Sequence, residues 1–398
     1  MKILFLTHTF PYPLDEGIKL MSWHLLKELS AQDEVALVSF IEEEKEREYI
    51  SKLKNFTRSV ETVLHKIPRS PRLRIKNILF ENQPFCIFQF WNEDFLKKIK
   101  ETAQSFKPDV MHFDFINTSI YRKFIPDTPA VFFPHDTMSM LFYRSATDEK
   151  ALIKKFYYRS QWTKMANYEK EIMPLFKITA VVSPVDRDWL LKNSPTADIR
   201  VIPNGVDAEY FKPLNDIVPE KNSLIFRGIM NFHPNVLSAV YFHKEIFPLI
   251  KREIPDIKFY VVGKNPAPEI KALHDNKNTI VTGYVEDIRQ YIGKSAVNVC
   301  PMITGSGIKN KVLEAMAMSV PTVATSMAVD GIPDAKDREN VLIANTPVEF
   351  VKKTIMLLKD SNLRSKIGGT GRKFVLEKYT WRSAAAQFRQ LYREVTRG

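Results

Sequence analysis

The sequence predicts an α/β protein with two domains, each built from a parallel sheet covered by helices. Two observations lead to this prediction. Short apolar, β-like runs alternate with longer helical ones, and the alternation starts again near Leu224. A chain of 398 residues, 44% of them hydrophobic and 26% charged, is also long enough to build two cores.

In the first half of the chain, short apolar runs predict strands and two periodic segments predict helices. The first helix is expected at residues 21–29, where the apolar spacing suits one buried face, and the second at 150–173, which is long and amphipathic. The strands are expected at residues 2–6, 35–40, 110–113, 130–133, 180–183 and 200–202. Such strands favour a parallel sheet with helices on both faces.

The second half repeats the pattern after a break near Pro203 to Asp207, where a proline and an Asn-Gly turn end a strand. Strands are expected at residues 224–226, 258–262, 279–281, 296–300 and 322–324, and helices at 234–251, 285–293 and 309–318. We therefore expect a first domain over residues 1–205, a linker over 206–222 and a second domain over 223–380. Facing domains of this kind bring the carboxyl ends of both sheets to one cleft, where open sheets bind ligands.

Composition limits the class of protein. Cys86 and Cys300 are too few for a disulfide framework, which favours a reducing compartment. The first apolar run is about five residues long, too short for a signal peptide or a membrane span, so we expect a cytoplasmic protein that is at most peripheral to a membrane. Motifs for zinc, a phosphate-binding P-loop, a nucleophile elbow or nucleic-acid recognition were sought in the sequence and not found.

The net charge of +12 favours anionic partners. One segment mixes basic and apolar residues with no acid between them. It either contacts an anionic membrane surface, which would be the inner face, or forms a solvated loop beside a helix. Its basic residues are Lys66, Arg69, Arg72, Arg74 and Lys76.

A glycine- and lysine-rich loop that runs into a helix is the strongest candidate site. Small residues let backbone amides approach a ligand, and the positive end of the helix faces an anion. Glu314, about one turn into the helix, could accept hydroxyl hydrogen bonds of the kind a ribose offers. The alternative is a helix cap followed by a buried apolar face. The candidate donor-binding residues here are Gly305, Ser306, Gly307, Ile308, Lys309, Lys311 and Glu314.

Three more candidates follow predicted strands. Gly17 precedes the first helix, where it could admit a phosphate or a sugar or simply serve a turn. His135 follows the strand at 130–133 and either contacts a substrate or caps the next helix. Arg227 follows the strand at 224–226 and is either an anion ligand or half of a surface salt bridge.

Several motifs together resemble glycosyltransferase family 4, whose members have the GT-B fold. The run Val-Ile-Pro-Asn-Gly-Val-Asp at residues 201–207 looks like the family's interdomain turn, and residues 307–324 are similar to its nucleotide-binding helix. Further similarities lie at residues 15–17, 182–183, 259–263, 283–289 and 379–381. The similarity is strongest in the second half and loose between about residues 41 and 105.

The resemblance implies two Rossmann-like domains facing a central cleft, with a C-terminal helix at 381–398 that crosses back onto the first domain. The first domain would bind the acceptor and the second a sugar nucleotide. Glu314 would hold the ribose, Gly17 would give the diphosphate room, and His135 would contact the transferred sugar. The family retains anomeric configuration and uses no metal or cofactor, because basic groups and helix dipoles neutralise the leaving diphosphate.

The chain departs from the family pattern at two places. Ser306 stands where a glutamate is usual, and Ile229 and Pro234 stand where an arginine and a lysine are usual. We expect Arg227, Lys309 and Lys311 to supply that charge. Their Gly-Ile-Lys-Asn-Lys arrangement is similar to a branch of the family associated with bacterial surface polysaccharides.

The favoured interpretation is a retaining hexosyltransferase that moves a sugar from a nucleoside-diphosphate sugar to a glycan or lipid-linked acceptor in polysaccharide or glycoconjugate biosynthesis. His135 and Glu314 are its candidate catalytic residues. A sugar-nucleotide epimerase of the same fold and a non-catalytic sugar-nucleotide-binding protein remain the alternatives.

Overall fold

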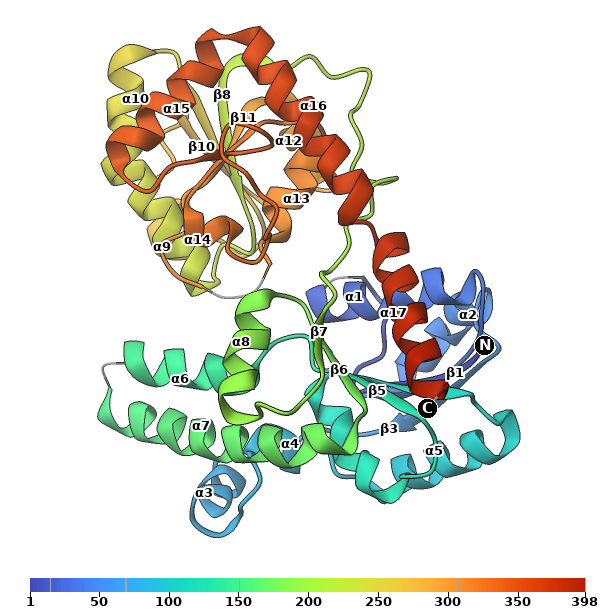
Figure 1. The fold of residues 1–398 in the computed structure, drawn as a ribbon. Coiled ribbons are helices and arrows are strands. Elements are labelled where there is room, and N and C mark those ends of the chain that lie inside the picture. Colours follow the sequence, from blue (N-terminus) through green and yellow to red (C-terminus); the bar gives the residue numbers. More distant parts are fainter. Residues whose placement is uncertain (15, 69, 150, 306–307, 398) are drawn as a thin grey trace. The chain divides into compact units, whose positions relative to one another are not determined.

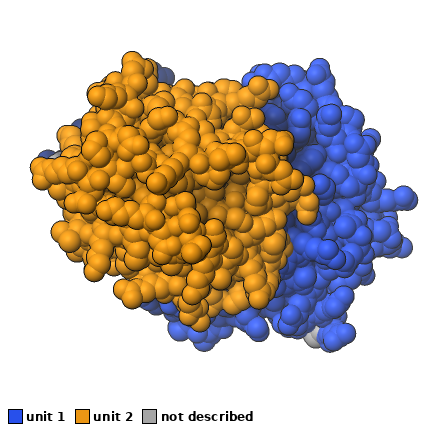
Figure 2. Space-filling model, turned by 90° about the horizontal axis from the view of Figure 1, so that it is seen from above, with its two compact units in different colours: residues 1–204, 381–398 blue, residues 205–380 orange. Residues whose placement is uncertain are grey.

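The computed structural model describes residues 1–398 except 15, 69, 150, 306, 307 and 398, and the chain divides into two compact units. Unit 1 comprises Met1–Asn204 and Trp381–Gly398, and unit 2 comprises Gly205–Thr380 (Figure 2). Each unit contains its own parallel sheet with helices packed around it (Figure 1). The predicted α/β fold with two parallel sheets is therefore confirmed.

Unit 1 is built on a parallel sheet with strand order β3-β2-β1-β4-β5-β6-β7. β1 lies between β2 and β4, with Phe5 opposite Leu37 on one side and His112 on the other. Ile3 to Leu6 are fully buried, as expected for a central strand covered on both faces. The strands are β1 Lys2–Thr7, β2 Glu34–Ile41, β3 Ser59–Leu64, β4 Val110–Asp114, β5 Ala130–Phe133, β6 Ile178–Val181 and β7 Ile199–Val201.

The helices of unit 1 include the C-terminal helix α17, which returns to this unit as the resemblance implies. α17 contacts α1, and its Tyr392 hydroxyl lies 2.8 Å from Nδ1 of His112 on β4. The helices are α1 Gly17–Ser30, η1 Glu44–Tyr49, α2 Ile50–Lys54, α3 Pro71–Phe80, α4 Phe85–Phe88, α5 Glu93–Phe106, η2 Ile116–Phe124, α6 Met138–Asp148, α7 Leu152–Ile172, η3 Met173–Leu175, α8 Pro184–Asn193 and α17 Trp381–Thr396.

Unit 2 has a parallel sheet with strand order β10-β9-β8-β11-β12-β13, so its first strand β8 is central. The strands are β8 Glu220–Arg227, β9 Lys258–Val262, β10 Thr279–Gly283, β11 Ser295–Cys300, β12 Thr322–Ala324 and β13 Leu342–Ile343. The helices are α9 His233–Tyr241, η4 Phe242–Ile246, α10 Phe247–Glu253, α11 Pro268–Lys271, α12 Ile288–Lys294, α13 Asn310–Ala317, α14 Ser326–Val329, α15 Pro347–Lys359 and α16 Ser361–Lys378.

Several boundaries differ from the sequence prediction for local reasons. The strand expected at 180–183 ends at Val181, because Ser183 caps α8 by accepting a hydrogen bond from the amide of Asp186. The segment expected as a linker through residue 222 contains the start of β8. Glu220 begins that strand, and its carboxylate accepts hydrogen bonds from the Tyr260 hydroxyl at 2.8 and 3.0 Å.

The helix expected at residues 234–251 is interrupted. α9 passes into a single π-helical turn, η4, and α10 then begins at Phe247 with Pro248 in its first turn. Proline has no amide hydrogen to donate to the preceding turn, so a regular α-helix cannot continue through it.

Membrane-spanning helices were searched for over the described residues, and no helix there is both long and apolar enough to cross a bilayer.

Candidate functional site

The glycine- and lysine-rich loop of unit 2 connects β11 to α13. Gly305 has φ +123°, a conformation that favours glycine, and a Cβ built there would lie 3.8 Å from Nζ of Lys309. Lys309 is the N-cap residue of α13 and is buried, and Ile308 before it is half-buried. The predicted site residues Ser306 and Gly307 lie outside the described residues. The loop therefore brings a lysine next to its glycine backbone at the positive end of a helix.

Glu314 and Arg227 form an ion pair between Oε2 and Nη1, with side chains 19% and 9% exposed. Nη2 of Arg227 also donates to the carbonyl oxygen of Lys311 at 3.0 Å. Arg227 does form a salt bridge, but the expected surface position is wrong, because the Arg227–Glu314 pair is largely buried. β8 and β11 are neighbouring strands, and this brings the end of β8 to α13.

Lys311 points into the interior of unit 2. Its Nζ donates a hydrogen bond to Oδ1 of Asn235 and lies 4.7 Å from the centre of the Phe226 ring. Burial is the main cause that lowers the pKa of Lys311 to about 8, and the positive charges of Arg227 and Lys309 lower it further. An anion bound nearby would stabilise the charged form of Lys311.

Sequence reasoning missed Asn235, which lies in the first turn of α9. Its Nδ2 donates to the carbonyl oxygen of Ile229 at 3.0 Å, and a Cβ built at Gly228 would lie 2.6 Å from the same atom. Glycine at 228 is therefore required for Asn235 to reach Lys311. The signal available in the sequence was the Gly228 position directly after a strand.

In unit 1, His135 follows β5 and is buried, with φ +63°. Its Nε2 lies 2.6 Å from Oδ1 of Asp114 at the end of β4, and its ring stacks on Phe115 at 3.9 Å between centres. The capping alternative is wrong: α6 begins at Met138 with Thr137 as its N-cap residue, so His135 lies outside the cap. Among the described residues, Nδ1 of His135 has no hydrogen-bond partner.

Asp114 is a second residue that sequence reasoning missed. It accepts a hydrogen bond from the Ser22 hydroxyl on α1, and Nε2 of His112 lies 3.6 Å from its Oδ1. Burial alone would raise the pKa of this carboxyl, but His135 and His112 more than offset burial and hold the pKa well below its usual range. Asp114 therefore stays ionised and orients His135. An acid at the end of a buried strand was the signal.

Gly17 is the first residue of α1. A Cβ built there would meet no atom of the described chain within 4 Å, and Gly17 does not adopt the left-handed conformation that requires glycine. Neither packing within unit 1 nor turn geometry therefore demands a glycine at this position.

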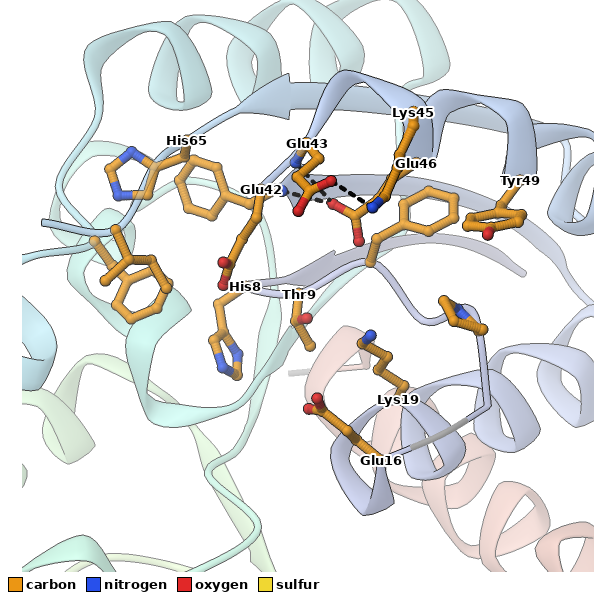
Figure 3. Close-up of a pocket in the computed structure, with 15 residues that line it drawn as sticks. His8, Thr9, Glu16, Lys19, Glu42, Glu43, Lys45, Glu46, Tyr49 and His65 are labelled. Atoms are coloured by element: carbon orange, nitrogen blue, oxygen red, sulfur yellow. Dashed lines mark hydrogen bonds and ion pairs between the residues drawn. The ribbon is translucent and has the colours of Figure 1, made fainter. Parts of the chain in front are cut away.

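A cavity of about 420 Å³ opens beside the ends of β1 and β2 in unit 1. In Figure 3, Glu42, Glu43 and Glu46 line one side, and His8 and Thr9 lie in the middle. Glu16, the N-cap residue of α1, and Lys19 in its first turn line the opposite side. The rings of Phe40, Phe90 and Tyr49 also line the cavity. Such a mixture of hydrogen-bonding groups and ring faces suits a polar, polyhydroxylated ligand.

Two of the acids in this cavity are already engaged. Oε2 of Glu46 accepts hydrogen bonds from the amides of Glu42 and Glu43 at 2.6 and 3.1 Å, and Glu43 pairs with Lys45 at 2.6 Å. Burial lowers the pKa of His8 to about 4, with His135 adding to the shift and Asp114 opposing it, so His8 is neutral at physiological pH. The cavity falls partly in the region where the sequence motifs are weakest.

Among the residues that the structure describes, no three or more His, Cys, Asp or Glu side chains are grouped so that they could hold a metal ion.

Two family models match the chain, one in each unit. The model described as Glycosyltransferase Family 4 matches residues 17–210, and the model described as Glycosyl transferases group 1 matches residues 221–360. An uncharacterized 44.6 kDa protein in the cps region of Klebsiella pneumoniae is 24% identical over 240 residues, which are 58% of this chain and 60% of the relative. The chain spans about 60% of the length of the curated relatives it matches.

Solved structures share the fold over nearly the whole chain. Sucrose-phosphate synthase from Thermosynechococcus elongatus has a TM-score of 0.71 at 15% identity and covers 99% of this chain and 98% of its own. Anabaena HepE in complex with UDP and glucose has a TM-score of 0.66 at 14% identity and covers 98% of this chain and 99% of its own. Because the two family models between them match most of both units, the chain belongs to the group 1, family 4 glycosyltransferases, which have the GT-B fold.

Proposed function

We propose that the protein is a retaining, metal-independent glycosyltransferase that transfers a hexose-type sugar from a nucleoside-diphosphate sugar to a glycan or lipid-linked acceptor. The observation that carries the proposal is the arrangement of Arg227, Lys311 and Glu314 around the start of α13. A carboxylate held by an arginine next to a buried lysine and a helix N-terminus matches the needs of a ribose diphosphate.

In this mechanism each group has a defined role. Glu314, oriented by Arg227, accepts hydrogen bonds from the ribose hydroxyls. Lys309, Lys311 and the amides of Gly305 and Ile308 offset the negative charge that grows on the diphosphate as the glycosidic bond breaks, and Gly17 gives the diphosphate room. In this proposal the basic groups, and not a divalent ion, stabilise the charge on the leaving diphosphate.

His135 contacts the transferred sugar. With Nε2–H donating to Asp114, its Nδ1 accepts a hydrogen bond from a sugar hydroxyl. The cavity at the ends of β1 and β2 would receive the acceptor, because its carboxylates and rings suit a polyhydroxylated molecule.

The comparisons support the substrate class. The HepE structure contains UDP and glucose, and the Klebsiella relative is encoded in a cps region. We place the reaction in surface polysaccharide or glycoconjugate synthesis. A lipid-linked acceptor would bring the protein to a membrane, with the basic segment from Lys66 to Lys76 as the contact.

The test incubates the protein with a panel of labelled UDP, GDP and ADP sugars. Hydrolysis or transfer of the sugar supports the proposal. An epimerised sugar nucleotide would show that the protein is an epimerase, and binding without turnover would show that it is a binding protein. Glu314→Gln should raise the donor KM at least tenfold, about 1.4 kcal/mol. The matched control Glu209→Gln, at a side chain that is 95% exposed, should leave it unchanged.

A further inference from the structure

α3 presents an apolar and basic face away from the rest of unit 1. Its inner side is held at Asn77, whose Oδ1 accepts a hydrogen bond from Gln161 of α7 and whose carbonyl oxygen accepts one from Lys164. Side chains two positions before and after Asn77 are rotated by about 200°, so Ile75 and Leu79 lie on the opposite side of the helix. They are 58% and 65% exposed, and Phe80 at the helix end is 76% exposed.

The first turns of α7 carry a second exposed apolar group, which was not recognised from the sequence. Leu152, Ile153 and Phe156 are 82%, 87% and 65% exposed. Three large apolar side chains within five residues, all exposed, mark a surface that another molecule or a membrane covers.

α3 contacts α7, and in Figure 1 it lies below α7 while α6 lies above it. The side-chain bonds from Gln161 and Lys164 keep α3 fixed on α7. The two exposed apolar groups therefore belong to adjoining helices of one rigid unit.

The charges of α3 and of the first turns of α7 have one sign. α3 contains Arg72, Arg74 and Lys76 and no acid, and α7 contains Lys154, Lys155, Arg159 and Lys164 before its first acid, Glu169. The nearest acids in sequence, Glu81 at the end of α3 and Asp148 and Glu149 at the end of α6, lie outside α3 and α7. A basic face around protruding Phe, Leu and Ile side chains is complementary to an anionic bilayer, whose headgroups attract the charges while its acyl boundary receives the apolar groups.

We propose that α3 and the first turns of α7 form a membrane-docking surface that inserts Ile75, Leu79, Leu152, Ile153 and Phe156 into the interface of an anionic lipid bilayer. This inference rests on the proposed function in its lipid-linked form, because a lipid-linked acceptor would lie in a membrane. Vesicle binding is measured without donor or acceptor, so that docking and sugar transfer can each fail alone.

The first experiment measures cosedimentation of the full chain with vesicles of phosphatidylglycerol and phosphatidylcholine, and with vesicles of phosphatidylcholine alone. We expect binding to the anionic vesicles only, weakening as salt rises. Leu152→Ser/Ile153→Ser/Phe156→Ser and Ile75→Ser/Leu79→Ser should each weaken binding at least tenfold. Lys154→Gln/Lys155→Gln should do the same, since each basic residue raises affinity about fivefold, roughly 1 kcal/mol.

Matched controls lie elsewhere on the surface. Val348→Ser removes an apolar side chain that is 73% exposed, and Lys97→Gln removes a charge that is 75% exposed. Both should bind vesicles like the parent protein. Because the substituted side chains in the surface and the controls are exposed, apart from the half-buried Lys155, all variants should unfold close to the parent's temperature.

The second experiment reports insertion at single positions. Ile153→Cys and Leu79→Cys, labelled with an environment-sensitive fluorophore, should brighten on addition of anionic vesicles, and Val348→Cys should not. Absence of binding at low salt, equal binding to neutral vesicles, or unchanged binding of both apolar variants would overturn the proposal. A dimer of the parent protein that dissociates in the apolar variants would also overturn it, because the face would then be covered by a second copy.

Discussion

At the scale of single residues, Lys311 carries an ammonium group into the interior of unit 2. Burial lowers its pKa from 10.5 to about 8, so the folded protein binds a proton less readily than the unfolded chain. Between pH 8 and 10.5 the unfolded state holds more protons, and stability therefore rises with pH across that window. The positive charge of Lys311 therefore destabilises the folded state, and a bound anionic ligand would offset this destabilisation.

We expect nucleotide binding to take up a proton near pH 8, because a diphosphate raises the pKa of Lys311 again. Affinity for UDP should fall by up to about tenfold per pH unit above pH 8. Calorimetry at pH 8 in two buffers with different ionisation enthalpies measures the proton uptake. Lys311→Met should abolish the uptake and weaken UDP binding while leaving stability equal or higher, because it replaces a buried charge by an apolar chain. Equal heats in both buffers would exclude this role.

Asp114 is expected to act through His135 rather than on the substrate. Asp114→Asn keeps the size of the side chain but no longer fixes the proton of His135 on Nε2, so kcat should fall at least tenfold while the donor KM changes little. Steady-state kinetics give both values. Ser22→Ala removes a different partner of Asp114 and should preserve kcat. A loss of activity that only follows a loss of folded protein would assign Asp114 a structural role.

At the scale of elements, α7 contains a buried acid within a long helix. Glu169 accepts a hydrogen bond from the amide of Ser139 at 3.0 Å, and burial raises its pKa to about 7, with Asp186 contributing. Between pH 4.5 and 7 the folded protein binds more protons than the unfolded chain, so this group's contribution to stability is present at low pH and is lost as pH rises through 7.

Glu169→Gln should therefore raise the melting temperature above pH 7 and leave it nearly unchanged at pH 4.5. The amide still accepts the bond from Ser139 but carries no charge, and the gain at pH 8 should be about 1 kcal/mol or more. Thermal unfolding at the two pH values measures it. The control Glu171→Gln, 68% exposed on the same helix, should show no such difference. A variant less stable than the parent at pH 8 would contradict the prediction.

Some strands could be predicted from the sequence with their correct bounds, and others were missed. β5, β9 and β12 have the expected bounds, because buried parallel strands are short apolar runs. β3 was missed since only Val60 and Val63 of its six residues are buried, and β13 was missed since it is two residues long. Edge strands depend on their neighbours rather than on their own composition.

At the scale of the whole molecule, the chain leaves unit 1 at Asn204 and returns to it at Trp381. Arg389 attaches α17 to α1 and to the residues that follow it. Its Nε lies 2.6 Å from Oδ2 of Asp33, and its Nη2 donates to the carbonyl oxygens of Glu28 and Leu29 at the end of α1. Both side chains of this ion pair are buried.

Arg389→Met should destabilise unit 1 by about 2 kcal/mol, less than the ~3–5 kcal/mol of a fully orphaned buried charge, because the amino group of Met1 still pairs with Asp33. All five tryptophans of the sequence fall in unit 1, so their fluorescence during urea unfolding reports this unit alone. UDP affinity should not change. Arg393→Met, exposed on the same helix, is the control; equal stability of both variants would exclude an anchoring role.

Much of the candidate site could be identified from motifs, but its pairings could not. Gly305, Lys309, Lys311 and Glu314 stand in one continuous segment, which is why the sequence indicated an anion site there. The partner of Glu314 lies on β8, and it reaches α13 only because β8 and β11 are neighbours in the sheet. The sequence shows which charged residues are present, but it does not show which strands are neighbours in the sheet.

The sequence by itself determined the alternation of strands and helices, the two sheets and the family, because periodicity and motifs are properties of neighbouring residues. Tertiary structure alone decided that Asp114 holds His135, that Lys311 donates a hydrogen bond to Asn235, and that α3 packs on α7. Those contacts join residues far apart in the chain, and strand order and side-chain packing, rather than local pattern, bring them together.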